Sequence, residues 1–397
     1  MPQSLLHDLY VPGARDTRAR QDFVSSLRGF VLNDMAARMR ASYDDEVEPQ
    51  AKRKLGRELK SGSEVHDAIT SNLSFKFYSS ARYNAQEMVW RSVIHALNDE
   101  GSDLGDKLKK ASAKADALGS KLTLDDSVEI PENVSAIDVH LAPGCYALAR
   151  DPEDYAAGAV YDHGLNVFSF GMMGRNLDDI GQSIANYLRL THPEFKVKDV
   201  LDMGCTVGHN TLAWANAYPD ADVTGIDVAA PCLRYAHARA GDQGVKANFR
   251  QMDATDMKFE DESFDVVFSS MFLHELSIKD INLALSEARR VLRPGGLLIN
   301  MELPSNHDVS AYDGFYLDWD SYYNNEPFYK KFRDQDFKKL CLKAGFEDDK
   351  FISFISPQYS YMDEADYKQA ISTEEEFGEN TGRLADGVQW FAFGAWK

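Results

Sequence analysis

The stretch VLDMGCTVGHNT (residues 200–211) decides how this chain folds. Its first four residues favour a strand or a bend, Gly204 and Gly208 permit a tight turn, and a helical pattern follows. Backbone N–H groups are free at the start of such a helix, where they can bind polar or anionic parts of a ligand. The stretch therefore predicts a nucleotide-like ligand at the carboxyl end of a strand.

Two glycine patterns compete for this turn. A dinucleotide-binding turn follows GxGxxG, which would need glycine at positions 204, 206 and 209, but position 206 is Thr and position 209 is His. The pattern DxGxGxG fits better, because Asp202, Gly204 and Gly208 match and only Thr206 departs from it. The turn thus disfavours a nicotinamide dinucleotide.

Strand and helix patterns alternate from residue 197 onward. Such alternation predicts an α/β fold, in which helices cover both faces of a parallel sheet. The five strand candidates are VKDVLDMG, ADVTGID, KANFRQMD, FDVVFSS and GLLINME. Two further candidates, FISFI (351–355) and QWFAFGAW (389–396), bring the expected sheet to seven strands.

Acidic residues end the second and third strand candidates. Asp227 closes ADVTGID, and a carboxylate there can accept hydrogen bonds from both ribose hydroxyls of a nucleoside. Asp253 closes the third candidate within RQMDATDMKF. Two more motifs follow in order, FDVVFSSMFLHEL and ARRVLRPGGLLINME.

Together these motifs resemble those of the class I S-adenosylmethionine-dependent methyltransferases, particularly small-molecule members related to the enzymes of ubiquinone and menaquinone synthesis. The resemblance covers roughly residues 177–303. It implies a Rossmann-like, seven-stranded methyltransferase sheet with S-adenosyl-L-methionine as the cofactor, and a contact of Asp253 with the adenine amino group. The cofactor-binding residues that we expect are Asp202, Gly204, Thr206, Gly208, Asp227, Val228, Asp253, Ala254 and Ser270.

Methyl transfer mainly requires alignment of the acceptor and, where needed, removal of its proton. His274 follows the fourth strand candidate and is the candidate catalytic base, because imidazole titrates near neutrality. Packing against the cofactor, or capping of the next helix, is the alternative role for His274. Asp202 could fix the glycine turn rather than bind the cofactor. His209 is expected to shape the pocket rather than take part in the chemistry. No His, Asp and Glu cluster has metal-ligand spacing, so we expect metal-independent chemistry.

Two aromatic-rich segments are candidates for the acceptor pocket. One is DYAAGAVYDHGLNVFSFGMMGRN (154–176), and the other is AYDGFYLDWDSYYNNEPFYKKF (311–332), within an insertion at 304–335. Aromatic faces suit a partly apolar acceptor and tolerate a sulfonium, although these rings could simply pack the structure together. The substrate-binding residues that we expect are Tyr155, Tyr161, His163, Phe168, Tyr312 and Tyr316.

The first third of the chain has helical patterns. We expect a first helix with the apolar stripe Phe23, Leu27, Val31, Met35 and Met39, and a second helix through Met88 and Leu97 that stops at DEGSDLG. A short solvent-facing helix is expected within 103–127, followed by a strand at SAIDVHL (135–141). Asn176 is then expected to cap a further helix. We therefore expect a mainly helical domain at 1–150, which covers the substrate pocket or mediates dimerisation, and a methyltransferase domain at 151–397.

Composition limits the partners. The chain has 63 acidic and 43 basic residues and a net charge of −20, which repels phosphate backbones and anionic lipid. We therefore expect neither a nucleic acid nor a membrane as a partner. The four cysteines form no CxxC pair, and the first residues lack the apolar core of a signal peptide, so we expect a cytoplasmic protein.

The leading hypothesis is a methyltransferase that acts on a small organic molecule at S, O, N or C. A thiol is slightly favoured, because a thiolate needs the least help from a base. The alternatives are a protein or peptide methyltransferase, whose helical domain would dock the substrate, and a non-catalytic regulatory protein that binds S-adenosyl-L-methionine.

Overall fold

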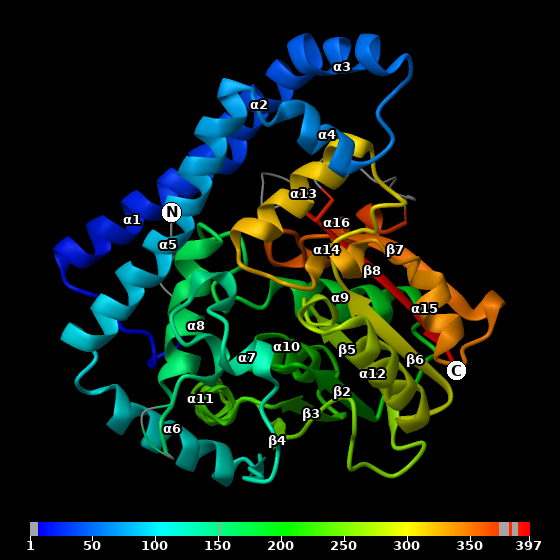
Figure 1. The fold of residues 1–397 in the computed structure, drawn as a ribbon. Coiled ribbons are helices and arrows are strands. Elements are labelled where there is room, and N and C mark those ends of the chain that lie inside the picture. Colours follow the sequence, from blue (N-terminus) through cyan, green and yellow to red (C-terminus); the bar gives the residue numbers. More distant parts are fainter. Residues whose placement is uncertain (1–6, 150, 152, 373–380, 383–387) are drawn as a thin grey trace.

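The computed structural model describes residues 7–149, 151, 153–372, 381–382 and 388–397. A sheet of eight strands in the order β1-β4-β3-β2-β5-β6-β8-β7 lies at its centre (Figure 1). β8 runs antiparallel to its neighbours β6 and β7, and the other pairs are parallel. The strands are β1 (Leu122–Thr123), β2 (Asp199–Met203), β3 (Asp222–Asp227), β4 (Asn248–Gln251), β5 (Phe264–Ser270), β6 (Leu292–Met301), β7 (Phe351–Pro357) and β8 (Gln389–Trp396).

Helices cover both faces of the sheet, which confirms the α/β, Rossmann-like fold. Val200 and Leu201 of β2 enter two different hydrophobic cores, because successive side chains of a strand point to opposite faces. The core around Val200 is completed by α9 (Asp179–Thr191) and α10 (His209–Ala217), and the core around Leu201 by α12 (Ile278–Val291) and α15 (Phe337–Lys343).

The strand order reverses at β2, which lies between β3 and β5. In an open parallel sheet, ligands bind at this point, outside the carboxyl ends of the strands. The turn after β2 places Gly204, Thr206 and Gly208 in the left-handed region, with φ of 70°, 48° and 74°. A Cβ at Gly204 would lie 2.2 Å from the Phe272 ring, so only glycine fits there.

Several of the helices before residue 118 pack directly on later elements of the chain. α1 and α5 lie side by side, α5 also packs on α8 (Ala156–Phe168), and α6 packs on α11 (Ala230–Gln243) (Figure 1). The division of the chain at residue 150 and a role in dimerisation stay predictions. The helices of this part are α1 (Arg15–Phe30), α2 (Ala36–Ser42), α3 (Glu48–Leu55), α4 (Gly62–Ile69), α5 (Leu73–Glu100) and α6 (Leu104–Ala117), with two π-helical turns, η1 (Val31–Met35) and η2 (Tyr43–Val47).

The remaining helical elements connect the strands or flank them. Among the described residues, no helix combines the length and the hydrophobicity that a membrane span requires. These elements are α7 (Glu132–Ser135), η3 (Val139–Leu141), η4 (Cys145–Ala147), η5 (Leu273–Glu275), α13 (Ala311–Tyr323), α14 (Tyr329–Arg333), η6 (Asp348–Lys350), η7 (Tyr359–Tyr361) and α16 (Glu364–Ala370).

Three local expectations were wrong. Residues 135–141 form no strand, because His140 and Leu141 have φ of 59° and 60° and bend the chain sharply. The helix at residue 179 is not capped by Asn176, since the left-handed Leu177 (φ 56°) separates them. The helix within 103–127 is not merely solvent-facing, because α6 buries one side against α11.

Two further expectations need correction. β1 adds an eighth strand, a two-residue edge strand that pairs with β4. Phe23 does not share the buried stripe of Val31 and Met39, since it is 57% exposed while they are fully buried. At 3.6 residues per turn, positions four residues apart drift by about 40° around a helix, so five such positions cannot share one face.

Candidate cofactor and acceptor site

Two adjoining cavities lie at the carboxyl ends of β2, β3 and β5. The larger has a volume of about 570 Å³ and the smaller about 80 Å³. Four residues line both cavities, namely Tyr146, Gly204, Thr206 and Met271. The turn after β2 is therefore the junction between the two.

The smaller cavity is lined by six of the predicted cofactor residues, namely Gly204, Thr206, Asp227, Val228, Asp253 and Ala254. Asp227 accepts one hydrogen bond on each carboxylate oxygen, from the N–H of Thr206 and the N–H of Ala229, both at 2.9 Å. Each oxygen keeps a second acceptor direction. Burial raises the pKa of Asp227, and the backbone N–H groups oppose this shift. This carboxylate can accept two hydroxyl donors, as a ribose would supply.

A segment between β1 and α8 also lines the smaller cavity, and sequence reasoning missed it. Pro131, Asn133 and Val139 belong to this lining. The Asn133 side chain donates to the Glu275 carbonyl at 2.9 Å, which ties the segment to the loop after β5. No local motif signals this contact, because the two residues are 142 positions apart.

Two predicted cofactor residues, Asp202 and Gly208, line neither cavity. Asp202 is 2% exposed and accepts a hydrogen bond from the Thr211 hydroxyl at 2.6 Å, which joins β2 to α10. Burial, together with the nearby Asp227 carboxylate, raises the pKa of Asp202 to about 7. The Thr206 hydroxyl donates to the Gly204 carbonyl at 3.4 Å, so it bonds within the turn.

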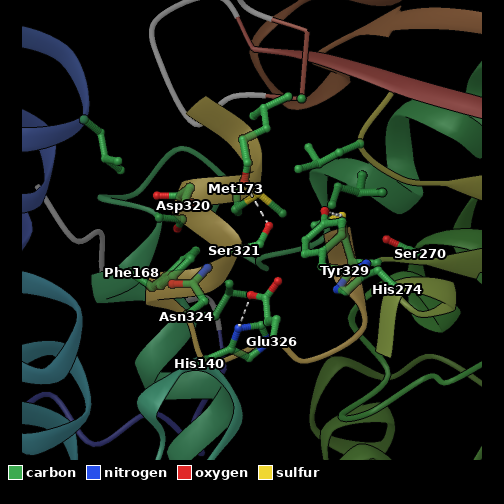
Figure 2. Close-up of a pocket in the computed structure, with 18 of the residues that line it drawn as sticks. His140, Phe168, Met173, Ser270, His274, Asp320, Ser321, Asn324, Glu326 and Tyr329 are labelled. Carbon is green, nitrogen blue, oxygen red and sulfur yellow. Dashed lines mark hydrogen bonds and ion pairs between the residues drawn. The ribbon is translucent and has the colours of Figure 1, made fainter. Parts of the chain in front are cut away.

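His274 and Ser270 line the larger cavity, as Figure 2 shows. His274 is 1% exposed, its Nδ1 lies 2.6 Å from Glu302 Oε2, and its ring stacks on Tyr329 with centroids 3.8 Å apart. The other Glu302 oxygen accepts the N–H groups of Phe272 (2.9 Å) and Leu273 (2.7 Å). Glu302 therefore fixes both the loop after β5 and the orientation of the imidazole.

The His274–Glu302 pair has the chemistry of a general base. Burial disfavours the charged imidazolium, but the Glu302 carboxylate outweighs this and raises the pKa of His274 above its ordinary value. When His274 is neutral, its Nδ1–H donates to Glu302 and its Nε2 lone pair is free to accept a proton.

A second histidine, His140, lies in the same wall. Its Nδ1 is 3.0 Å from Glu326 Oε1, and its Nε2 is 2.9 Å from the Tyr146 hydroxyl and 3.4 Å from Glu275 Oε1 (Figure 2 shows the pair with Glu326). Burial opposes the charge, yet hydrogen bonding to Glu275 and Glu326 raises the pKa of His140 to about 10. Sequence reasoning missed these residues, which no motif connects.

Four of the six predicted acceptor residues line the larger cavity, namely Tyr161, Phe168, Tyr312 and Tyr316. Tyr155 and His163 do not. A Cβ at Gly105 of α6 would lie 2.8 Å from the Tyr155 hydroxyl, so this tyrosine packs between helices. His163 Nε2 accepts the N–H of Val11 at 2.8 Å, so it anchors the chain's first described residues.

His209 lines the larger cavity at the start of α10. Its Nε2 lies 2.7 Å from Asp162 Oδ1, and Tyr235 donates to the other oxygen of that carboxylate at 2.8 Å. Burial, with the positive Arg239 nearby, lowers the pKa of His209 to about 4. A neutral histidine whose Nε2 already bonds Asp162 is consistent with a role in shaping the pocket.

Comparisons with known proteins agree with this geometry. A family model described as a methyltransferase domain matches residues 200–296. The demethylmenaquinone methyltransferase of Thermus thermophilus is 35% identical over 107 residues, 27% of this chain and 48% of that protein. The ubiquinone/menaquinone biosynthesis C-methyltransferase of Burkholderia multivorans is 31% identical over 164 residues, 37% of this chain and 67% of that protein.

A solved structure shows weaker similarity. Phosphoethanolamine N-methyltransferase 2 of Haemonchus contortus with S-adenosyl-L-methionine is 20% identical, with a TM-score of 0.39, over 59% of this chain and 57% of that chain. That similarity is too low to support an argument. The sequence matches, however, show that the chain belongs to the class I S-adenosylmethionine-dependent methyltransferases. The chain spans about half the length of the curated relatives it matches.

The residues present fit the cofactor of this family, S-adenosyl-L-methionine. Asp227 offers two acceptor directions to a ribose, and Asp253 and Ala254 line the same small cavity. Gly204 and Thr206 lie where this cavity meets the larger one, so they would adjoin the methionine portion. The larger cavity is then left for a methyl acceptor.

Proposed function

We propose that this chain is a methyltransferase that transfers a methyl group from S-adenosyl-L-methionine to a small organic acceptor. The observation that carries the proposal is the larger cavity, about 570 Å³, which adjoins the cofactor pocket at Gly204 and Thr206. His274, which is paired with the buried Glu302, lies in its wall. A base beside the site of methyl transfer is what an acceptor that must lose a proton requires.

The lining supports a small acceptor rather than a peptide. Residues of α1, α8, α13 and the sheet domain all contribute to the wall, and most of their side chains are apolar or aromatic. His274 and Glu302 are 1% and 0% exposed, so a substrate must enter the protein to reach them. A protein substrate would instead need an open groove that brings one side chain to the base. The alternative of a non-catalytic binding protein leaves this buried pair without a role.

The bound cofactor supplies an electrophilic methyl group on a sulfonium, which needs no further activation. Asp227 and Asp253 would hold its nucleoside, while Phe168, Tyr312 and Tyr316 exclude water from the acceptor. His274 Nε2 accepts the proton of the acceptor as its nucleophile attacks, and Glu302 keeps Nδ1 protonated throughout. A thiol remains slightly favoured, because it ionises more readily than an alcohol, at a pKa of about 8.5.

The test is a screen of thiols, phenols, amines and hydroxy acids, followed through release of S-adenosylhomocysteine. With the acceptor that turns over best, His274→Ala should lower turnover by ~10²- to 10⁴-fold. His95→Ala is the matched control, because His95 is half exposed on α5 and outside the cavity lining. Wild-type turnover in His274→Ala would mean that His274 has a packing role and is not the base.

Calorimetry tests the cofactor separately from the acceptor. S-adenosyl-L-methionine should bind saturably and NAD should not. Saturable NAD binding without S-adenosyl-L-methionine binding would end the proposal. Cofactor binding with no turnover across the whole screen would favour the regulatory alternative.

A further inference from the structure

The larger cavity contains a buried cation that no carboxylate neutralises. Arg28, in the last turn of α1, is 1% exposed and lines the cavity. Its Nε donates to the Phe168 carbonyl at 3.0 Å, its Nη1 donates to Gln86 Oε1, and its Nη2 has no partner. Within the described part of the chain, no carboxylate oxygen lies within 4.0 Å of this guanidinium.

A second buried arginine increases the excess of positive charge. Arg82 shares Gln86 Oε1 with Arg28, at 3.1 Å, and is itself paired with Asp320 and Asn324. Two guanidinium groups thus face one carboxylate, and the cluster carries a net charge of +1. Burial and the neighbouring Arg82 lower the pKa of Arg28 to about 9, so Arg28 still carries its charge at neutral pH. An unpaired buried charge is costly, and an anionic ligand would relieve that cost.

The position of Arg28 separates it from the cofactor. Its guanidinium stacks over the Phe168 ring, 4.0 Å from the centroid, and Figure 2 shows Phe168 across the pocket from Ser270 and His274. The next residue, Ser169, is fully buried in the same wall, and its hydroxyl also has no partner. Two unsatisfied polar groups therefore lie at the end of the cavity away from the expected methyl donor.

We propose that the methyl acceptor carries a carboxylate, which binds Arg28 and Ser169 while its nucleophilic atom lies beside His274. This inference rests on the proposed function and adds the chemical class of the substrate. A guanidinium and a hydroxyl match the single charge and the two oxygens of a carboxylate. A phosphate, with three oxygens and up to two charges, would leave an oxygen and a charge without a partner.

The experiment compares carboxylates with their neutral amides. Benzoate, 3-phenylpropanoate and decanoate are titrated by calorimetry, each beside its amide, into the full-length protein saturated with S-adenosylhomocysteine. The carboxylate that binds best should bind roughly 10- to 100-fold more tightly than its amide. Arg28→Met should abolish this preference, and Arg28→Lys should keep part of it, since it keeps the charge but not the planar fork.

Several results would overturn the inference. The wild-type protein could bind acid and amide with equal affinity, or it could bind no carboxylate at millimolar concentration. The third such result is a preference for the carboxylate over its amide that survives in Arg28→Met. A loss of S-adenosylhomocysteine affinity in Arg28→Met, with the carboxylate preference intact, would instead assign the guanidinium to the cofactor.

Ser169→Ala provides a second variant in case Arg28→Met does not fold. It should weaken binding of the carboxylate by roughly 3- to 10-fold and leave binding of the amide unchanged. Comparing these titrations with the turnover screen separates the two proposals. A protein that prefers carboxylates but turns over no acceptor would contradict the proposed function alone, whereas turnover of neutral acceptors only would contradict the carboxylate site alone.

Discussion

At the scale of single residues, Asp227 both shapes the backbone and lines the smaller cavity. Its two oxygens accept the N–H groups of Thr206 and Ala229, which shapes the turn after β2 and the start of α11. The same residue lines the smaller cavity. We therefore expect that replacing Asp227 disturbs both the turn and the binding of the cofactor.

We expect Asp227→Ala to weaken the binding of S-adenosyl-L-methionine by ~1–3 kcal/mol, because the ribose hydroxyl donors would lose a charged acceptor. Asp227→Asn should weaken it less, since one acceptor oxygen remains. Calorimetry measures both changes. Asp222→Ala, at the exposed start of the same strand, is the control and should bind normally. Unchanged affinity in Asp227→Ala would contradict the assigned role.

The His274–Glu302 pair predicts how the rate depends on pH. A general base works only when it is neutral, so kcat/KM should fall as pH decreases through the pKa of His274. Because Glu302 raises that pKa, the fall should be centred above the ordinary histidine value of about 6.5. Glu302→Gln removes the negative charge and should move the fall to lower pH.

The measurement is kcat/KM between about pH 5 and about pH 9, with the best acceptor from the screen. Glu347→Gln, on an exposed residue before η6, is the control and should leave the profile unchanged. A Glu302→Gln profile that coincides with the wild type would show that Glu302 does not set the pKa of His274.

Thr206 carries backbone strain where the family pattern has glycine. A β-branched residue at φ 48° costs of order 1–3 kcal/mol, which exceeds the entropic cost of glycine, about 0.5–1 kcal/mol. We therefore expect Thr206→Gly to stabilise the protein by about 1 kcal/mol in denaturant unfolding. Thr206→Ala keeps the strain and should give no gain. Equal effects of the two variants would mean that the turn is not strained.

At the scale of elements, the contact between α6 and α11 depends on one glycine. A Cβ on Gly241 would lie 2.0 Å from the Ala111 carbonyl oxygen and 2.5 Å from the Ala115 nitrogen. Backbone atoms cannot give way as a flexible side chain can. Gly241→Ala should therefore push α6 outward and destabilise the protein by ~1–3 kcal/mol.

Gly29→Ala makes the same change at a helical position of α1 where nothing lies within 4 Å of the new Cβ. It should stabilise by about 0.5–1 kcal/mol, because alanine loses less entropy than glycine in a helix. Urea unfolding of both variants tests whether their free energies of unfolding change in opposite directions. A stabilising Gly241→Ala would contradict the close approach of the two helices.

Most elements could be predicted from the sequence, because their hydrophobic periodicity is local. All seven predicted strands are present, and α5 ends at Glu100 within the predicted stop DEGSDLG. Two of the errors occur where no periodicity exists. β1 has only two residues, and η3 bends at His140, whose left-handed backbone no composition signals.

At the scale of the whole molecule, the net charge of −20 predicts a stability that depends on salt. Excess like charge repels itself in the compact state, and the Debye length falls from about 30 Å at 0.01 M to about 8 Å at 0.15 M. We expect Tm to rise by about 2 °C or more over this range of NaCl. KCl should act equally, since screening depends on ionic strength. An unchanged or lower Tm would show that screening of attractive ion pairs prevails.

The site was predictable in part. The cofactor side follows from residues at strand ends, and Asp227, Asp253, Gly204 and Ser270 lie at the two cavities. Of the residues that aromatic density favoured for the acceptor, Phe168, Tyr161, Tyr312 and Tyr316 line the larger cavity, whereas Tyr155 and His163 do not. Composition predicts that aromatic rings lie near the pocket. Whether a given ring lines the cavity depends on which helix packs beside it.

The sequence by itself determined the strand–turn–helix at residues 200–211, the alternating sheet and the acids that would hold a nucleoside, because each is encoded by neighbours in the chain. Only the tertiary structure decided which residues meet around the larger cavity. Arg28, His140, His274 and Glu326 line one cavity although they come from α1, η3, η5 and the loop before α14. Local sequence sets conformation, but residues so far apart meet only when the packing of whole helices brings them together.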